Sequence, residues 1–193
     1  MQTTEKIRLD ESHIYWLGQE RIPGYSEIMK SAGIGINPFW TDSGRDLGTA
    51  LHQWVLFLAQ GQEPEDAPDE RIAGRVAAFR RFIEESGFKF AGGEEPQYEP
   101  NLRYACTPDL WGHIGSFSCV IDVKSGAKEL SHSAQTAAQK LALAANGFRA
   151  QKRYALYLKD DKTYRLCEHM DSVDESRWRA IVTAHHAKQW YCQ

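Results

Sequence analysis

The stretch from Tyr104 to Gln139 constrains the fold more than any other part of the sequence. Arg103 to Gly112 and Phe117 to Lys124 have the alternating residues of β-strands, and His113 to Ser116 contains a glycine suited to a turn between them. A helical pattern follows from Ser131 to Asn146. We therefore expect a β-hairpin that leads into a helix.

Helical and strand-like segments alternate along the rest of the chain, which predicts a single α/β domain over residues 1–193. We expect its centre to be a mixed β-sheet flanked by helices. In the N-terminal part we expect extended structure over residues 1–25, a short helix capped by Ser26 that runs through Ala32 and ends at Gly33 and Gly35, and a loop at Asn37-Pro38 and residues 41–44. Two longer helices follow, one from Gly44 or Arg45 to Gln60 and one from Pro68 to Ser86 that is ended by Gly87, with a linker at 62–69 between them. The other expected elements are short strands at 88–91 and 96–99, a hairpin of 153–159 with 164–169, and a helix from Asp174 to Tyr191.

Composition predicts a soluble globular protein, because 42% of the 193 residues are hydrophobic and 25% are charged. No window approaches the roughly 18 consecutive apolar residues of a membrane-spanning helix. The N-terminal residues are polar and of mixed charge, unlike a signal peptide, so we expect a cytoplasmic protein without a membrane partner. The four cysteines form no C-x-x-C pair, which argues against a zinc or iron–sulfur site.

Charge is distributed unevenly around a formal net charge of −3. Residues 61–99 carry ten acidic and five basic side chains, whereas residues 124–165 carry nine basic and three acidic ones. A basic segment can bind phosphate backbones through release of their counterions. It can equally be a solvated surface, and the sequence leaves both possibilities open.

Two carboxylates of the expected hairpin fall on the same face of the sheet. Side chains of a strand alternate between faces, so Asp122 and Lys124 point one way while the intervening Val123 points the other. Folding the hairpin about Ile114-Gly115 sets Asp109 opposite Val120, which makes Asp109 and Asp122 diagonal neighbours at about 7 Å. This arrangement depends on the register, because a slip by one residue would move Asp109 to the other face.

A divalent cation would resolve the repulsion between these two carboxylates. Mg²⁺ prefers oxygen ligands and keeps several water molecules, and Mn²⁺ suits similar sites. Such an ion can activate a water for attack on a phosphodiester, and Lys124 would then stabilise the charge that develops on the phosphoryl group. The alternative is that Asp122 and Lys124 are only a solvent-facing pair, since a D-x-K triplet also occurs by chance.

The ordered set of short motifs resembles the PD-(D/E)XK nuclease superfamily, and more narrowly its RecB-like and lambda-exonuclease-like branch. The residues that carry this resemblance are Pro108-Asp109, Asp122-Val123-Lys124, the G-x-x-x-H stretch from Gly48 to His52, and Gln135 in the place of the first residue of a Gln-x-x-x-Tyr motif. The lead-in from Tyr15 to Ala32 is similar to that of phage-type members. The sequence departs from the pattern at position 139, where Gln139 replaces the tyrosine.

The resemblance implies a restriction-endonuclease-like core and a DNA nuclease that uses Mg²⁺ or Mn²⁺, acting as an exonuclease in phage replication, recombination or repair. It also implies DNA as partner, with a homo-oligomer or a recombination protein as further partners. A non-catalytic nucleic-acid-binding or assembly protein and a site-specific endonuclease are the alternatives. Glu95 is left without an assigned role. The roles implied for single residues are metal ligation by His52, Asp109, Asp122 and the Val123 carbonyl, catalysis by Asp109, Asp122 and Lys124, and substrate binding by Gln135.

Overall fold

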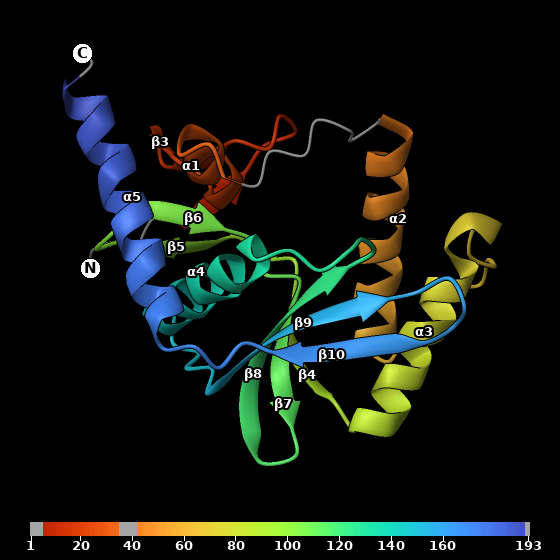
Figure 1. Ribbon diagram of the computed structural model, residues 1–193. Helices are drawn as coiled ribbons and strands as arrows, with labels where there is room; N and C mark the ends of the chain where they lie inside the picture. The colour runs from red at the N-terminus through yellow and green to blue at the C-terminus, as the bar shows by residue number, and fades with distance from the viewer. Residues whose placement is uncertain (1–5, 35–41, 192–193) are drawn as a thin grey trace.

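The computed structural model describes residues 6–34 and 42–191 (Figure 1). Its helices are α1 (Tyr25–Ser31), α2 (Asp42–Ala59), α3 (Glu70–Ser86), α4 (Ser131–Ala145) and α5 (Val173–Tyr191). Its strands are β1 (Ile7–Leu9), β2 (Tyr15–Leu17), β3 (Glu20–Ile22), β4 (Lys89–Gly92), β5 (Gln97–Glu99), β6 (Tyr104–Cys106), β7 (Leu110–Ile114), β8 (Phe117–Lys124), β9 (Lys152–Leu158) and β10 (Tyr164–Glu168).

A five-stranded sheet in the order β10-β9-β8-β7-β4 forms the centre of the molecule. Only β8 and β9 pair in parallel, so the sheet is mixed, as the sequence predicts. The amphipathic helices α2 and α3 lie side by side and cover one face of this sheet (Figure 1), with Leu51, Phe79 and Ile121 in their shared core. Helix α4 packs against β8 and β9. The predicted α/β fold class is confirmed.

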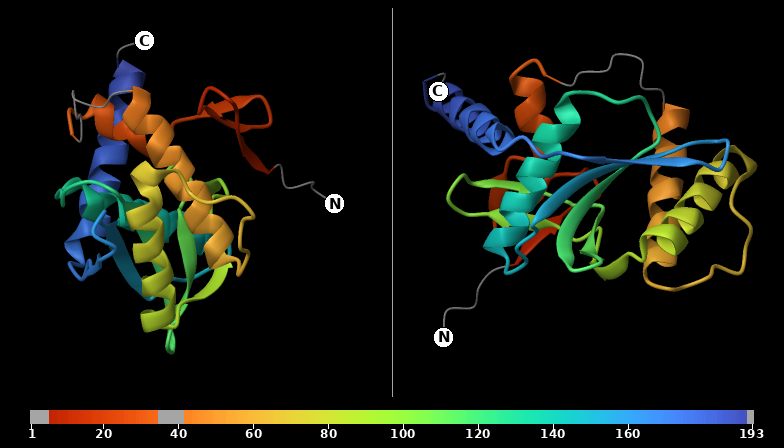
Figure 2. Two further views of the ribbon diagram at one scale, coloured as in Figure 1. Left: turned by 90° about the vertical axis from the view of Figure 1, so that its right-hand side faces the viewer. Right: turned by 60° about the horizontal axis from the view of Figure 1, so that its bottom comes forward.

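A second layer of short elements surrounds α4 on the side away from α2. The strands β1, β2 and β3 form a small antiparallel sheet, while β5 and β6 pair separately (Figure 2). Gly24 bridges to Ala105 and so joins these two units. Helix α5 closes the layer, because Trp178 is fully buried against Tyr25 and Tyr104 at ring-centroid distances of 5.0 Å each. No helix in the described ranges is both long enough and apolar enough to cross a membrane.

The central hairpin differs from its prediction in two respects. Arg103 to Gly112 is not one strand, because β6 pairs with β5 in a separate sheet and the chain then breaks before β7. The turn lies after Ile114, where Gly115 has a φ of 59°, so Leu110 rather than Pro108 faces Ile121. Continued by one residue, this register sets Asp109 against Asp122 instead of Val120. The strand register therefore differs from the predicted one by two residues, which leaves Asp109 on the predicted face of the sheet.

Two predicted helix starts are wrong. Ser26 does not cap α1, which begins at Tyr25 after an uncapped Gly24, and the Tyr25 ring packs at a tilt against Trp178 of α5. Residues 42–44 are not a loop, because α2 begins at Asp42, and small polar residues of this kind are favoured at helix starts. Gly35 and Asn37-Pro38 lie outside the described residues. The end predicted for α3 is confirmed by the left-handed Gly87.

Candidate active site

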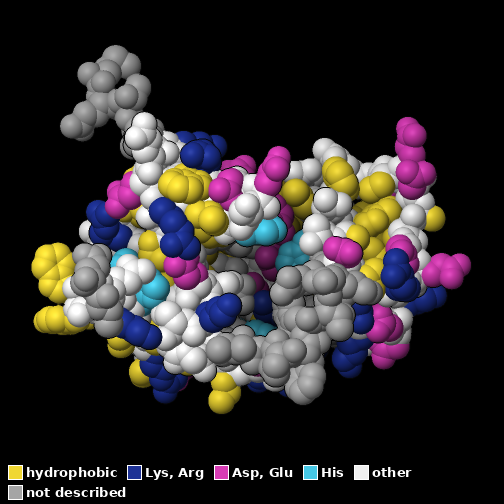
Figure 3. Space-filling view, turned by 90° about the horizontal axis from the view of Figure 1, so that it is seen from above, with side chains coloured by type: hydrophobic (Ala, Val, Ile, Leu, Met, Phe, Trp, Pro, Cys, Tyr) yellow, Lys and Arg dark blue, Asp and Glu magenta, His cyan; other side chains and the backbone are white. Residues whose placement is uncertain are grey.

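The predicted site residues come from four separate elements and meet at the end of β8. Asp122, Val123 and Lys124 are the last three residues of β8, and Asp109 lies in the break before β7. The backbone N–H of Val123 donates to Asp109 Oδ2 at 2.5 Å, which fixes Asp109 beside β8. Helix α2 supplies His52 from one side, and α4 supplies Gln135 from the other. Figure 3 shows a hollow near the centre of this face, with histidine and acidic side chains along its edge.

Three of the side chains at this site form a group suited to a metal ion. His52, Glu94 and Asp109 each offer one ligand atom, and these atoms all lie within 4.8 Å of one another. His52 Nδ1 is 3.0 Å from Glu94 Oε1 and 3.4 Å from Asp109 Oδ1. The charge of Asp109, assisted by hydrogen bonds to both carboxylates, raises the pKa of His52 to about 11. The two carboxylates therefore favour the protonated, positively charged form of His52.

Glu94 is a site residue that the sequence reasoning missed in favour of an unassigned Glu95. Its backbone has a φ of 53°, and its N–H donates to the Pro108 carbonyl at 2.9 Å. A Cβ added to Gly93 would lie 2.4 Å from the Asp109 carbonyl oxygen, so only glycine permits this close approach. An irregularity in β4 pairing before Gly92 re-aims the chain at the same point. The double glycine was the signal available in the sequence.

Asp122 and Lys124 form a buried ion pair next to this group. Asp122 is fully buried, and its Oδ2 lies 2.7 Å from Lys124 Nζ. Burial, together with the nearby charge of Asp109, raises the pKa of Asp122 despite the opposing effect of Lys124. Burial alone would lower the pKa of Lys124, but the charges of the two aspartates outweigh it and raise that pKa. The lysine is therefore a fixed positive charge at neutral pH.

Two glutamines of α4 hold this ion pair in place. Lys124 Nζ donates to Gln135 Oε1 at 2.9 Å, and Gln139 Nε2 donates to Asp122 Oδ1 at 2.9 Å. The two glutamines are four residues apart and so lie on the same face of the helix. Gln139 is only 1% exposed. The residue at which the sequence departs from the family motif thus contacts a site carboxylate directly, a role that sequence reasoning missed.

The residues present fit a divalent cation. Carboxylate oxygens and an imidazole nitrogen are suitable ligands for Mg²⁺ or Mn²⁺. Asp122 Oδ2 is buried, and apart from its 2.7 Å ion pair with Lys124 it has no hydrogen-bond partner in the described part of the chain, so a lone pair of this oxygen is left for a cation. Asp122 lies outside the three-residue group, because its carboxylate is turned to Lys124 and Gln139. Val123 contributes its N–H, and the predicted role of its carbonyl stays a prediction.

A cavity of about 290 Å³ opens beside the two glutamines. Its walls come from the N-terminal sheet, α1, β6 and α4, and include Tyr15, Tyr25 and Thr107. The Tyr15 hydroxyl is 2.9 Å from Thr107 Oγ1, and the Tyr25 hydroxyl donates to the Ser131 carbonyl at 3.1 Å. Both tyrosines are therefore fixed, and they bound the space next to Asp122 on one side.

No protein-family model matches the sequence, and no curated protein matches it. Among solved structures, the chain is similar to an alkaline exonuclease, LHK-Exo from Laribacter hongkongensis, with a TM-score of 0.48 and 16% sequence identity over 84% of each chain. It is also similar to LHK-Exo in complex with dAMP, with a TM-score of 0.42 and 18% identity over 86% of this chain and 87% of that chain.

Proposed function

We propose that this protein is a divalent-metal-dependent nuclease that hydrolyses phosphodiester bonds in DNA. The observation that carries the proposal is the juxtaposition of His52, Glu94 and Asp109, within 4.8 Å of one another, with the buried Asp122–Lys124 pair. A histidine and three carboxylates around a single lysine suit metal-assisted hydrolysis better than a purely structural role, because burying the two neighbouring carboxylates Asp109 and Asp122 destabilises the fold.

In this mechanism His52, Glu94 and Asp109 would hold the cation, and Asp122 would be a further carboxylate ligand. When bound, Mg²⁺ or Mn²⁺ supplies electrophilic assistance and makes a nucleophilic water available at neutral pH. Lys124 Nζ offsets the negative charge that builds on the phosphoryl oxygens as water attacks phosphorus and the bond to the leaving oxygen breaks. Gln135 keeps the lysine oriented, since its Oε1 accepts a hydrogen bond from Lys124 Nζ.

We further propose that the enzyme is an exonuclease. The cavity of about 290 Å³ beside Gln135 and Gln139 is bounded by hydrogen-bonded tyrosines, which favours a strand terminus over a continuous duplex. The proposal includes a single nuclease-like domain over residues 1–193, a cytoplasmic location, a role in phage replication, recombination or repair, and assembly as a homo-oligomer or with a recombination protein. These last points rest on the motif resemblance.

Loss of an end-labelled linear DNA in Mg²⁺ or Mn²⁺, with EDTA as the blank, tests the enzyme proposal. Lys124→Ala should lower kcat by about 10²–10³-fold, as removal of a preorganised charge at a developing anion does. Lys152→Ala is the matched control, because Lys152 is also ion-paired but lies at the start of β9, away from the site. Absence of cleavage with every divalent metal would make the non-catalytic alternative the better explanation.

Covalently closed circular DNA separates the two modes of cutting. An exonuclease leaves the circle intact and degrades it only after it has been linearised. Internal cutting of the closed circle would refute the exonuclease proposal and favour a site-specific endonuclease.

A further inference from the structure

The basic side chains of residues 124–165 separate into two classes in the structure. Of the nine lysines and arginines in this segment, four form ion pairs: Lys124 with Asp122, Lys140 with Glu175, Lys152 with Glu168 and Arg153 with Asp174. The other five have no ion pair with any described residue: Lys128, Arg149, Lys159, Lys162 and Arg165. The excess positive charge of this segment therefore resides on five side chains.

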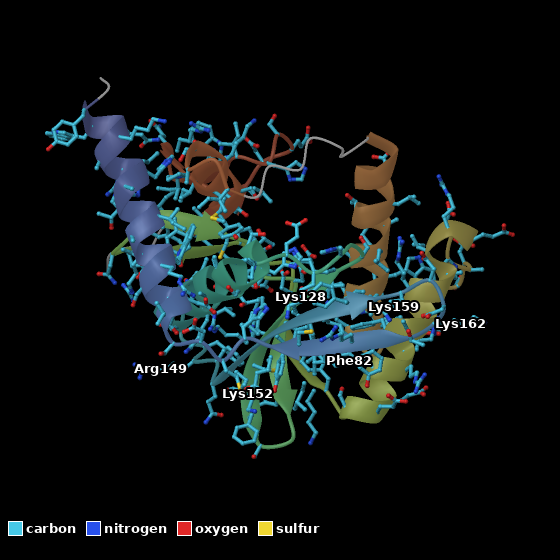
Figure 4. All side chains as sticks on the ribbon, in the orientation of Figure 1. Phe82, Lys128, Arg149, Lys152, Lys159 and Lys162 are labelled. Carbon is cyan, nitrogen blue, oxygen red and sulfur yellow. The ribbon has the colours of Figure 1, made fainter. Side chains whose placement is uncertain are left out.

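Three of these five line a single cavity. Lys128, Lys159 and Arg165 surround a space of about 300 Å³, to which Ser125, Gly126 and Tyr157 also contribute. Figure 4 shows Lys159 and Lys162 near the β9–β10 turn, and Lys128 above β9, whereas Arg149 and Lys152 lie toward the opposite end of β9. The unpaired charge is thus concentrated on one side of the sheet.

This cavity continues the candidate active site across the sheet. Lys124 pairs with Tyr157 in the parallel β8–β9 register, and Tyr157 pairs with Arg165 in the antiparallel β9–β10 register. Paired residues of neighbouring strands point to the same face, so Lys124, Tyr157 and Arg165 form one row. Neighbouring strands are about 4.8 Å apart, which puts Arg165 about 10 Å from Lys124. A stacked nucleic-acid strand spans that distance with about three nucleotides, at a rise of about 3.4 Å each.

Contacts from α3 and α4 hold the walls of this cavity in place. A Cβ added to Gly74 of α3 would lie 2.0 Å from the Asp160 carbonyl oxygen, so the helix packs directly on the β9–β10 turn. Arg75 donates to Asp160 Oδ2 at 2.9 Å and ties the same turn to α3. On the other wall, the Tyr157 hydroxyl lies 2.8 Å from His132 Nδ1 of α4. The two cationic residues Lys159 and Arg165 are therefore presented from a supported hairpin.

We propose that this cavity is a phosphate-backbone subsite that holds the substrate strand about two to three nucleotides from the scissile phosphate. The strand crosses β8, β9 and β10 in that order, from Lys124 to Arg165. The proposal rests on the proposed nuclease function, because it takes the scissile phosphate to lie at Lys124. Lysine and arginine contacts of this kind bind the phosphate backbone whatever the DNA sequence, so the subsite adds affinity and positions the strand without selecting bases.

Binding of a fluorescent single-stranded oligonucleotide to the full chain, measured in EDTA over a series of salt concentrations, tests the subsite without any cleavage. Arg165→Gln removes one contact and should lower the slope of log K against log salt by about 0.7, or about fourfold in affinity at about 0.15 M salt. The triple variant Lys128→Gln, Lys159→Gln, Arg165→Gln should lower the slope by about 2 and the affinity by about 50-fold. The matched control is Arg149→Gln, which removes an arginine that is also exposed and also without an ion pair among the described residues, from the other end of β9.

Unchanged slopes in the Arg165 and triple variants would overturn the subsite, as would an equal loss in Arg149→Gln, which would indicate a general effect of net charge. Thermal melting of each variant verifies that these surface substitutions leave the fold intact. A chain that binds with the expected slopes but cuts no DNA with any metal would refute the proposed nuclease function and keep the subsite. A chain that cuts DNA with unchanged slopes would do the reverse.

Discussion

Replacement of Gln139 by methionine tests whether this glutamine keeps Asp122 ionised. Gln139 Nε2 donates to Asp122 Oδ1 at 2.9 Å, and both side chains are almost completely buried. Methionine has a similar length and shape but no donor. Because burial already raises the pKa of Asp122, the loss of a donor that favours the charged form raises it further.

The size of the effect follows from the nature of the hydrogen bond. A hydrogen bond to a charged group contributes about 1.5–3 kcal/mol, which corresponds to a movement of about one to two pH units in a titration. We therefore expect the acid limb of the pH–rate profile to move up by about that amount, with rates close to wild type at the alkaline end. Stability should change by less than about 1 kcal/mol, because the substitution also removes Gln139 Oε1, a buried acceptor without a partner in the described part of the chain.

Steady-state cleavage of a linear oligonucleotide from pH 5 to pH 10, at saturating Mn²⁺, measures this profile. Gln135→Met is the comparison, since Gln135 lies on the same helix face but accepts from Lys124 rather than donating to Asp122. We expect Gln135→Met to lower the rate without an equal movement of the acid limb. A uniform loss of rate across the pH range in Gln139→Met, with the acid limb unmoved, would refute the reasoning and assign Gln139 a packing role.

Three further predictions concern the metal group and the fold. The pKa of His52 is raised to about 11, whereas metal coordination requires a neutral imidazole, so Mn²⁺ binding at pH 7–9 should release about one proton. Calorimetry of Mn²⁺ binding in buffers of different ionisation enthalpy measures this release, and equal binding heats in all buffers would contradict it. Gly93→Ala should destabilise the chain by about 1–3 kcal/mol in urea unfolding and weaken Mn²⁺ binding, because its Cβ would lie 2.4 Å from the Asp109 carbonyl oxygen. Asp174→Ala should cost about 3 kcal/mol in the same assay, since it leaves the buried Arg153 without its 3.0 Å partner; an unchanged unfolding midpoint would contradict this.

Local patterns were sufficient to predict much of the fold. The two-residue period of β8 predicted that Val123 would face the core while Asp122 and Lys124 would share the opposite face, and the structure confirms both. Such predictions succeed because the period of a strand depends only on neighbouring residues. The break before β7 was not predictable in the same way, since it exists because β6 pairs with β5 in a different sheet.

The charge of the segment 124–165 illustrates a second kind of limit. A count of its lysines and arginines gives the same weight to Arg153, which is buried against Asp174, and to Arg165, which is exposed at a cavity. The difference depends on acidic partners such as Glu168 and Glu175, which lie outside the segment. The sequence therefore predicts that this segment is basic, while the fold decides where that charge is available.

The choice between Glu94 and Glu95 was set by the backbone and not by residue type. Both are glutamates in one loop, and only the left-handed φ of 53° at Glu94, next to a glycine that allows contact with Asp109, turns that side chain toward His52. Gln139 shows the converse. At this position the sequence departs from the family motif, yet an amide N–H can donate to a carboxylate as a phenolic O–H can, and Gln139 does so with Asp122. A departure from a motif weakens a functional hypothesis only when the new residue cannot supply the same donor or acceptor at the same place.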